Sequence, residues 1–266
     1  MTTHPFAGHA ALITGASAGI GAALAVELAR QGADVVLFAR RADRLASVAV
    51  EVEATGRRAV VVVGDVRVRS DVDAAVAAAL AAFGRLDVVV ANAGYGVAGR
   101  VDALTVDDFR RQYETNVFGV LHTIHAALPA LTVGRGRLGI VGSVAGYIGA
   151  AGAAPYCSSK AAVRAIAESL RAELAASGVS VTHIVPGYVT SELRLKDNSE
   201  RLDPAAPDSA PPWLVVPADA AARDITRALR RRRAEVIITW QARVGVAVAR
   251  FAPRVARWVA GRMVRG

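Results

Sequence analysis

Residues 14–21 read Thr14-Gly15-Ala16-Ser17-Ala18-Gly19-Ile20-Gly21 and follow the apolar run Ala10–Thr14. Glycines at such a point let the chain turn tightly and approach a bound pyrophosphate, and a helix that follows offers free N–H groups and the positive end of its dipole. The spacing is G-x-x-x-G-x-G, whereas the general dinucleotide fingerprint is G-x-G-x-x-G. The glycines alone also fit an ordinary strand–helix turn. Their place after the first strand of an alternating chain indicates a nucleotide-binding loop.

Outward from this loop, short apolar runs alternate with alanine-rich helical stretches. The predicted strands are Ala10–Thr14, Asp34–Ala39, Ala59–Gly64, Leu86–Ala91, Arg137–Ser143, Val179–Val185 and Glu235–Thr239, and the predicted helices lie near 20–31, 42–55, 70–83, 106–131, 156–177 and 218–232. Nearly continuous apolar strands are buried on both faces, and long connections imply parallel strands with right-handed crossovers. We therefore predict an α/β fold with a doubly wound, Rossmann-type, mostly parallel seven-stranded sheet and helices on both faces. In such sheets ligands bind at the carboxyl ends of the strands, where the strand order reverses.

The composition fits one large domain, which we assign to residues 1–240. The chain has 266 residues, is 53% hydrophobic and contains a single cysteine, Cys157. One cysteine excludes an intramolecular disulfide and a cysteine-cluster metal site and favours a reducing compartment. Apolar runs such as Ala59–Val63 are too short to span a bilayer, and the first residues lack the pattern of a signal peptide. We expect a cytoplasmic protein.

Residues 195–217 break the alternation. This stretch is polar and holds five prolines, so it is neither a regular helix nor a central strand. A long loop inside a domain is typical of a lid or of a solvated insertion. Because it directly follows a strand's carboxyl end, we favour a substrate lid.

The positive charge is concentrated at the end of the chain. Residues 223–266 carry twelve arginines against two acids, a net charge of +10 in a chain of +9, so the remainder sums to about −1. A domain-wide nucleic-acid surface is therefore not expected. Residues 241–266 form a basic amphipathic extension that Pro253 breaks or kinks; its arginines at 243, 250, 254, 257 and 265 lie opposite Val248, Ala252, Val255, Val259 and Met263. It could pack on its own domain or a neighbouring subunit, lie on a membrane surface, or bind acidic partners.

The second predicted strand ends in Phe38-Ala39-Arg40-Arg41. An acidic residue here would accept hydrogen bonds from the adenosine ribose and mark a preference for NAD. Ala39 lacks that carboxylate, whereas Arg40 and Arg41 can bind a 2′-phosphate. The alternative, a charged start to the next helix, predicts acids, since the helix dipole disfavours cations there. We predict NADP(H).

A second constellation is Ser143 followed by Tyr156 and Lys160. Tyr156 and Lys160 are four residues apart and share a helix face. A nearby ammonium stabilises a phenolate and lowers the pKa of the tyrosine, so that Tyr156 can exchange a proton with a carbonyl or alcohol oxygen. Ser143, just after a strand's end, can hold that oxygen. The chain has thirty arginines and only two lysines, so a lysine at this point is notable.

At this stage the chain resembles the short-chain dehydrogenases/reductases in their single-domain form, well over residues 9–193 and more loosely over 218–239. The glycine motif, Asn92-Ala93-Gly94 and the set Asn116, Ser143, Tyr156 and Lys160 match the family's cofactor loop, central motif and catalytic tetrad. The resemblance implies cofactor contacts from Gly15, Ser17, Gly19, Ile20, Gly21, Arg40, Arg41, Asp65, Val66, Asn92, Ala93, Gly94, Tyr156, Lys160, Pro186, Gly187, Val189 and Ser191. It also implies a homo-oligomer, either a dimer or a tetramer.

By the same resemblance, Tyr156 is the acid/base and Ser143 orients the substrate oxygen. Lys160 lowers the tyrosine pKa and binds the nicotinamide ribose, and Asn116 holds a water of the proton relay. Pro186-Gly187-Tyr188-Val189 fits the loop around the nicotinamide. There is one departure: Ser191, preceded by Thr190, stands where the family usually has threonine, which leaves open which hydroxyl meets the carboxamide.

These features predict an NADPH-dependent oxidoreductase that interconverts a carbonyl and an alcohol, with a lipophilic small molecule as the favoured substrate. Within the family, an epimerase or dehydratase is the alternative; outside it, a regulatory protein that binds NADP without turnover. His122 and His125 are interpreted as an ordinary helix face and not as metal ligands, and Cys157 as a buried thiol. Tyr95 either lines the substrate pocket or caps its loop.

Overall fold

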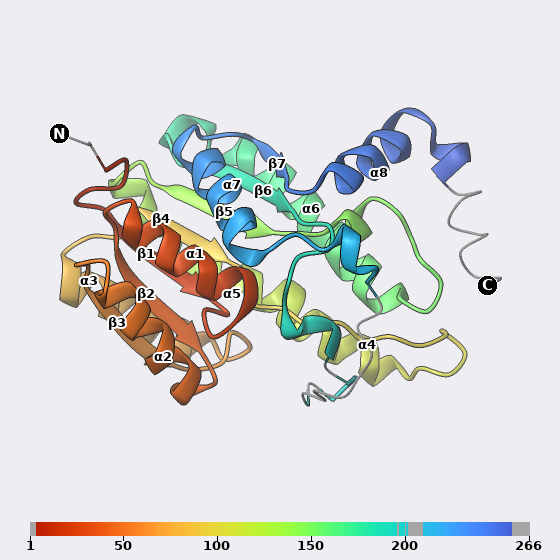
Figure 1. The fold of residues 1–266 in the computed structure, drawn as a ribbon, viewed down its shortest axis with the longest axis horizontal. Helices are drawn as coiled ribbons and strands as arrows, with labels where there is room; N and C mark the ends of the chain where they lie inside the picture. The colour runs from red at the N-terminus through yellow and green to blue at the C-terminus, as the bar shows by residue number, and fades with distance from the viewer. Residues whose placement is uncertain (1–3, 196, 200, 202–209, 257–266) are drawn as a thin grey trace.

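The computed structural model describes residues 4–195, 197–199, 201 and 210–256, and within them one parallel sheet forms the centre of the protein (Figure 1). Its strands are β1 (Ala10–Thr14), β2 (Asp34–Ala39), β3 (Ala59–Val63), β4 (Val88–Ala91), β5 (Arg137–Val141), β6 (Ser180–Val185) and β7 (Glu235–Ile237). The spatial order is β3-β2-β1-β4-β5-β6-β7, and every pairing is parallel. The predicted doubly wound, seven-stranded sheet is confirmed.

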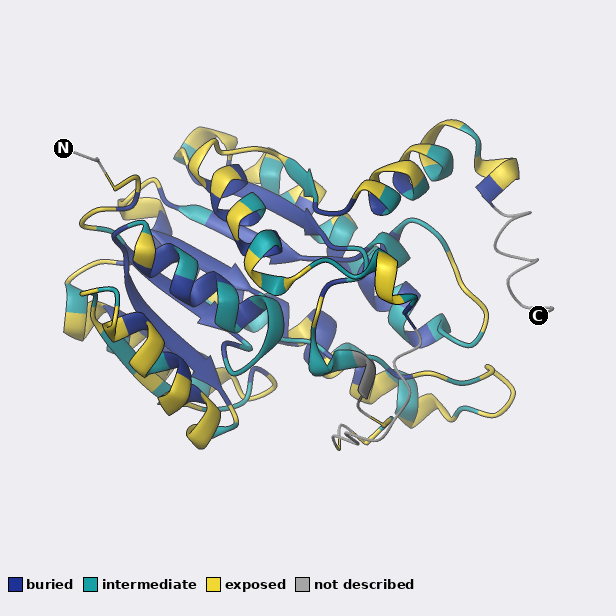
Figure 2. Ribbon diagram, viewed as in Figure 1, coloured by how far each residue is buried: buried dark blue, intermediate teal, exposed yellow. Residues whose placement is uncertain are grey.

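Helices cover both faces of this sheet. The helices α1 (Gly19–Arg30), α2 (Ala42–Glu53) and α7 (Ala218–Arg230) pack on one face, and α3 (Arg69–Phe83), α5 (Gly119–Val133) and α6 (Ala154–Glu173) on the other. Strand β2 shows why the strands are apolar throughout: Val35 and Leu37 join the first core, whereas Val36 and Phe38 join the second. Figure 2 shows the central strands buried and the outer helix faces exposed, whereas the edge strands β3 and β7 are partly exposed. Both sheet faces are therefore core.

The strand order reverses beside β1. Strand β1 pairs with β2 on one side and β4 on the other, so the connections leave in opposite directions. The glycine loop follows β1, and Asn92 follows β4. The topology thus places both at one edge of the sheet.

The prediction of one regular helix over 106–131 is wrong. It consists of α4 (Val106–Tyr113), a π-helical turn over Glu114–Phe118, and α5. A π turn carries an extra residue and is frequent at functional sites. This one buries Asn116 completely.

The same stretch, 106–133, is long and apolar enough to cross a membrane by length and composition. In the folded chain, however, Val120, Ile124 and Leu131 are buried against the sheet. It is the core helix of this domain.

The beginning of the C-terminal extension packs on the domain. Helix α8 (Trp240–Phe251) buries Ala242 and Val246, and Thr239 caps its N-terminus. Helix α8 ends at Phe251, Ala252 is not helical, and residues 253–256, from Pro253 on, are helical again. Packing on the domain, one of the three alternatives for this segment, applies to α8. The predicted face positions at 257, 259, 263 and 265 lie outside the described residues.

One ionic cluster anchors α8 to the sheet. An Arg250 Nη donates to both Glu235 oxygens at 2.9 Å and to the Tyr147 hydroxyl at 3.2 Å. Tyr147 also donates to Glu235, and the His183 Nδ1 lies 3.5 Å from the same carboxylate. Burial alone would raise the pKa of Glu235, but hydrogen bonds from His183, Tyr147 and Arg250 outweigh it and lower the pKa to about 2.

We expect Glu235→Gln to lower the free energy of unfolding near neutral pH. A carboxylate whose pKa is about 2 when folded, against an ordinary 4.5, stabilises the fold above pH 4.5, and that contribution is lost as the pH falls toward 2. The difference between wild type and variant should therefore narrow with acidification. Urea denaturation from about pH 6 to about pH 3 measures it.

Glu168→Gln is the matched control, because Glu168 is half exposed and its contact with Arg164 is 3.4 Å long. Exposed pairs of this kind contribute little. Two results would contradict this anchoring. One is a difference in the free energy of unfolding between wild type and Glu235→Gln that stays constant with pH, and the other is a difference no larger than that of the control.

Candidate active site

The glycine loop forms a cradle at the end of β1. Gly15 and Gly19 have φ angles of +67° and +55°, which side chains rarely adopt, and a Cβ on Gly21 would collide with the Gly15 carbonyl oxygen. The N-terminus of α1 has no side-chain cap and no acid in its first turn. Its N–H groups are therefore placed to receive an anion, as a nucleotide pyrophosphate requires. The residues at this point fit a dinucleotide.

Two polar side chains hold this loop to the end of β4. The Thr14 hydroxyl accepts hydrogen bonds from the backbone N–H groups of Asn92 and Ala93, at 3.0 and 3.1 Å. The Asn92 amide donates back to the carbonyls of Thr14 and Gly15, at 2.9 and 3.3 Å. The motif Asn92-Ala93-Gly94 thus lies directly beside the glycine loop.

Arg41 lies above the glycine loop and contacts an acid that sequence reasoning missed. Its Nε and Nη2 donate to the Ser17 hydroxyl at 3.3 and 3.1 Å, and its Nη1 to the Glu192 carboxylate at 2.7 Å. Arg44 lies 3.7 Å from the other Glu192 oxygen. A glutamate after the Pro186–Val189 loop carried no motif signal, so only the fold brings it to these arginines.

Arg40 turns to the neighbouring strand end. Its Nη1 lies 3.8 Å from Asp65, which also pairs with Arg67. Arg40 and Arg67 line a cavity of about 500 Å³ together with Tyr95, Arg111, Asn198 and Ser199. Tyr95 is 1% exposed. The structure thus puts Tyr95, Arg40 and the start of the 195–217 segment around one cavity; whether Tyr95 lines the substrate pocket or caps its loop stays a prediction.

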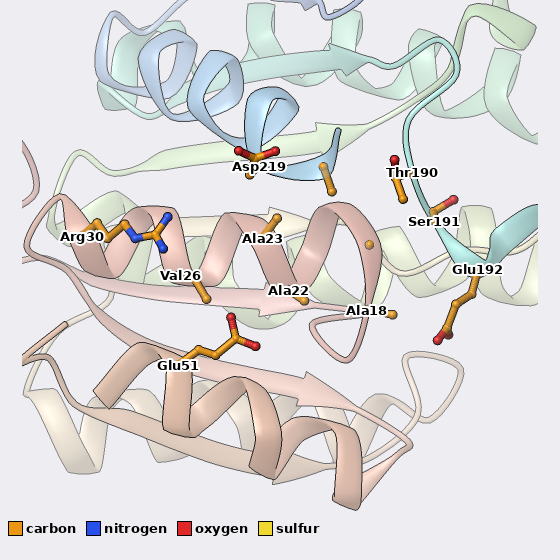
Figure 3. Close-up of a pocket in the computed structure, with 12 residues that line it drawn as sticks. Ala18, Ala22, Ala23, Val26, Arg30, Glu51, Thr190, Ser191, Glu192 and Asp219 are labelled. Atoms are coloured by element: carbon orange, nitrogen blue, oxygen red, sulfur yellow. The ribbon is translucent and has the colours of Figure 1, made fainter. Parts of the chain in front are cut away.

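The loop after β6 reaches across to α1. A Cβ on Gly19 would lie 3.0 Å from the Ser191 Cβ, whereas the Thr190 hydroxyl lies 3.5 Å from the Val216 carbonyl oxygen. Figure 3 shows Thr190, Ser191 and Glu192 opposite Ala18 and Ala22, around a cavity of about 510 Å³. Ser191 is therefore the hydroxyl residue next to the glycine loop.

The 195–217 segment is tied down at both ends. Val189 and Val216 form an isolated bridge, with backbone bonds from Thr190 to Val216 and from Val216 to Tyr188. The Asn198 amide bonds both the N–H and the carbonyl of Ala98, at 2.9 and 2.7 Å. Much of the segment, including residues 202–209, lies outside the described residues. Its assignment as a substrate lid stays a prediction.

Lys160 is the buried charge of the site. Its Nζ donates to the Val141 carbonyl at 2.8 Å, at the end of β5, and lies 5.8 Å from the centre of the Tyr156 ring. The side chain is fully enclosed, and burial lowers the pKa of Lys160 to about 8. A lysine held in this way beside a tyrosine marks a functional site.

Ser143 begins a short helical turn that stacks on α6. Its hydroxyl accepts from the Ala145 N–H at 3.1 Å. A Cβ on Gly146 would lie 2.7 Å from the Lys160 carbonyl oxygen, so this turn and α6 are in direct contact. Tyr156 lies one turn before Lys160, facing Gly96, where an added Cβ would come 3.7 Å from its ring. The turn that begins at Ser143 therefore packs on the part of α6 that carries Lys160, one helical turn after Tyr156.

Asn116 connects the loop after β4 to α6. Its amide nitrogen donates to the Tyr95 carbonyl at 3.0 Å and to the Ser159 hydroxyl at 3.2 Å, and its oxygen accepts from the Tyr95 N–H at 3.1 Å. Gln112, four residues earlier, bonds Tyr95 and Val97 at 2.7 and 2.6 Å. Sequence reasoning missed Gln112, although its spacing from Asn116 puts both on one helix face.

The Pro186–Val189 loop lies between the Ser143 turn and α8. The Pro186 carbonyl accepts from the Val144 N–H at 3.2 Å, and a Cβ on Gly187 would collide with the Thr239 hydroxyl. The C-terminal helix therefore supports this loop and the Ser143 turn.

His122 contacts the backbone, and Cys157 is buried. The His122 Nδ1 lies 2.9 Å from the Val66 carbonyl oxygen, and Cys157 is a buried free thiol. Among the described residues, no group of three His, Cys, Asp or Glu side chains could hold a metal ion.

Three comparisons agree with this geometry. The family model for short chain dehydrogenases matches residues 9–202. An uncharacterized oxidoreductase of Myxococcus xanthus is 37% identical over 96% of this chain and 97% of its own. A short chain dehydrogenase/reductase of Burkholderia phymatum, solved with NAD, superposes with a TM-score of 0.83 at 26% identity, covering 95% of this chain and 96% of that one. An alcohol dehydrogenase of Thermococcus sibiricus, solved with 5-hydroxy-NADP, gives 0.76 at 29% identity, covering 87% and 96%.

The solved relatives hold their nicotinamide dinucleotides in folds of this type, and the cradle described above fits such a cofactor. The chain therefore belongs to the short-chain dehydrogenase/reductase family of oxidoreductases.

Proposed function

We propose that this oxidoreductase interconverts a carbonyl and an alcohol with NADP(H), in the direction of ketone reduction. The observation that carries the proposal is the buried Lys160 ammonium, which lies under the Tyr156 ring at the carboxyl edge of the sheet. A cation enclosed at a tyrosine is suited to stabilise a phenolate, which is the state that general acid catalysis by Tyr156 must pass through.

In this reaction a bound nicotinamide supplies the hydride. Tyr156 donates its hydroxyl proton to the carbonyl oxygen of the substrate, and Ser143 holds that oxygen by a hydrogen bond. Lys160 stays protonated below a pH of about 8 and stabilises the Tyr156 phenolate left behind. For alcohol oxidation the proton moves in the opposite direction, to Tyr156.

Asn116 and Ser191 complete the proposed set. The Asn116 amide is already bonded to Tyr95 and Ser159, so its side chain positions the loop after β4 against α6. A relay water at Asn116 remains a prediction. Ser191, next to Gly19, is the hydroxyl we assign to the nicotinamide carboxamide, since Thr190 faces Val216.

The preference for NADP(H) rests on Arg41 and Ser17. The guanidinium lies on the Ser17 hydroxyl at the cofactor loop, where it can bind a 2′-phosphate in bidentate fashion. Arg40 supports it from the Asp65 side. Glu192 occupies part of the same fork at 2.7 Å, so a phosphate must replace this carboxylate as the partner of Arg41.

We further propose a lipophilic substrate and a homo-oligomeric, cytoplasmic enzyme. The competing function is a regulatory protein that binds NADP without turnover. Lys160 could serve cofactor binding alone, but its place at the Tyr156 ring favours the enzyme, because binding without turnover needs no proton donor.

We expect Tyr156→Phe to lower kcat by about 10²–10⁴-fold and to leave NADPH affinity nearly unchanged, because only the proton donor is lost. NADPH oxidation with a panel of ketones of graded chain length, together with cofactor titration, measures both. Tyr113→Phe, on α4, is the matched control and should keep full activity. NADPH binding without turnover of any carbonyl by the wild type would instead favour the regulatory protein.

Lys160→Met tests the buried cation without an activity assay. A lysine with a pKa of about 8 when folded and 10.5 when exposed destabilises the fold while charged, and this cost fades as the pH rises from 8 to 10.5. The free energy of unfolding of cofactor-free wild type should therefore rise relative to Lys160→Met across that range. A difference that does not change with pH would show that Lys160 titrates at its ordinary value.

Arg40→Ala with Arg41→Asp should weaken NADPH binding by about tenfold or more and leave NADH binding almost unchanged, since a charged hydrogen bond to phosphate contributes about 1.5–3 kcal/mol. Glu192→Gln should instead tighten NADPH binding, because it replaces the carboxylate that competes with the phosphate for Arg41 by a neutral amide. Fluorescence titration with both cofactors measures the ratio. Equal losses for the two cofactors in the arginine variant would mean that these residues only support the fold.

A further inference from the structure

Helix α8 exposes an apolar row on the side opposite its packed face. Trp240, Val244 and Phe251 are 62%, 55% and 86% exposed, whereas Ala242 and Val246 are buried. At about 100° per residue, the three exposed side chains fall within about 40° of one another. Figure 1 shows α8 lying along the outside of the molecule. These three side chains therefore lie on the same side of the helix.

Trp213 is a further exposed tryptophan, in a turn that contacts the start of α8. It belongs to a short turn, Pro212–Leu214, and is 75% exposed. The Gln241 amide on α8 donates to the Leu214 carbonyl, which joins that turn to the first residues of the helix. We call Trp213, Trp240, Val244 and Phe251 the α8 face. Large exposed apolar patches on a folded domain mark interaction sites.

The segment that begins with α8 is rich in arginine. From residue 236 to residue 266 the sequence has six arginines and no acid. Arg243 and Arg254 are exposed, and Arg250 is held by Glu235. Tryptophan and arginine beside an apolar row are typical of helices that lie in the headgroup region of a membrane.

We propose that the α8 face binds the surface of an anionic phospholipid bilayer, with α8 parallel to the membrane. A second copy of the chain fits less well, because a two-fold contact places the same patch on both sides and would oppose arginine to arginine. Anionic headgroups complement this charge, and the bilayer takes up the aromatic side chains. Binding of this kind places the Pro212–Leu214 turn, at the end of the 195–217 segment, against the lipid.

Vesicle binding by the full chain tests the proposal. The protein should sediment with vesicles of phosphatidylcholine containing about 30% phosphatidylglycerol, and much less with phosphatidylcholine alone. Binding should fall as salt is raised to about 0.5 M. Two of the chain's three tryptophans, Trp213 and Trp240, belong to the α8 face, so a blue shift of the emission reports on it.

The decisive variant is Trp240→Ser with Phe251→Ser, which alters only exposed side chains and should weaken vesicle binding by about tenfold or more. The matched control is Val50→Ser with Val106→Ser, two valines of similar exposure on α2 and α4, which should bind like the wild type. NADPH binding of both variants should be unchanged, which shows that they fold.

Three results would overturn the proposal. The first is no binding to anionic vesicles at low salt. The second is equal binding of the two double variants. The third is a smaller particle for Trp240→Ser with Phe251→Ser in size-exclusion chromatography without lipid, which would identify the α8 face as a subunit contact. Turnover of a water-soluble ketone without vesicles is a separate measurement, so failure of the proposed reaction stays distinguishable.

Discussion

The site depends on one enclosed cation. The Lys160 ammonium is buried away from water and donates a hydrogen bond to the Val141 carbonyl at 2.8 Å. Burial lowers the pKa of Lys160 to about 8. Such a group is costly to bury, so its surroundings have to be held rigidly. Gly94 lies beside both Asn116, in the π turn, and the Lys160 Nζ, and the turn that begins at Ser143 packs on the Lys160 backbone. The cost is consistent with chemistry that needs a charge at this point.

The periodicity of the sequence predicted the strands and most of the helices, because a strand buried on both faces leaves an unmistakable apolar run. It did not predict the π turn at Glu114–Phe118, since one additional residue in a helix hardly changes the apolar pattern. The glycine loop and the Tyr156–Lys160 pair were found because their spacing has a chemical reason. Gln112 and Glu192 were missed because their partners, Val97 and Arg41, come close only in the folded chain.

In the C-terminal segment, the sequence pattern shows an amphipathic helix but does not show which side of that helix packs on the domain. Of the three alternatives for this segment, packing on the domain implies that the apolar side is packed and that the arginines lie in water. In α8, Arg250 instead reaches Glu235 and Tyr147 at the domain surface, while Phe251 is left 86% exposed. A pattern analysis assigns the apolar side to the core by default. Here small residues, Ala242 and Val246, make the contact, and the larger side chains face outward.

Glu192 connects cofactor choice to the loop after β6. In the structure its carboxylate is the anion that Arg41 and Arg44 hold, on the side where a 2′-phosphate would bind. Under the proposed preference for NADP(H), a phosphate that takes over Arg41 would leave Glu192, at the start of the short turn Glu192–Leu195, with Arg44 as its cationic partner, whereas NADH would leave the Arg41 ion pair in place. The two cofactors would then differ both in affinity and in how firmly this loop is tied to α2. Because Ser191 and Glu192 are adjacent, the side chain next to the glycine loop and the side chain paired with Arg41 lie on one segment of backbone.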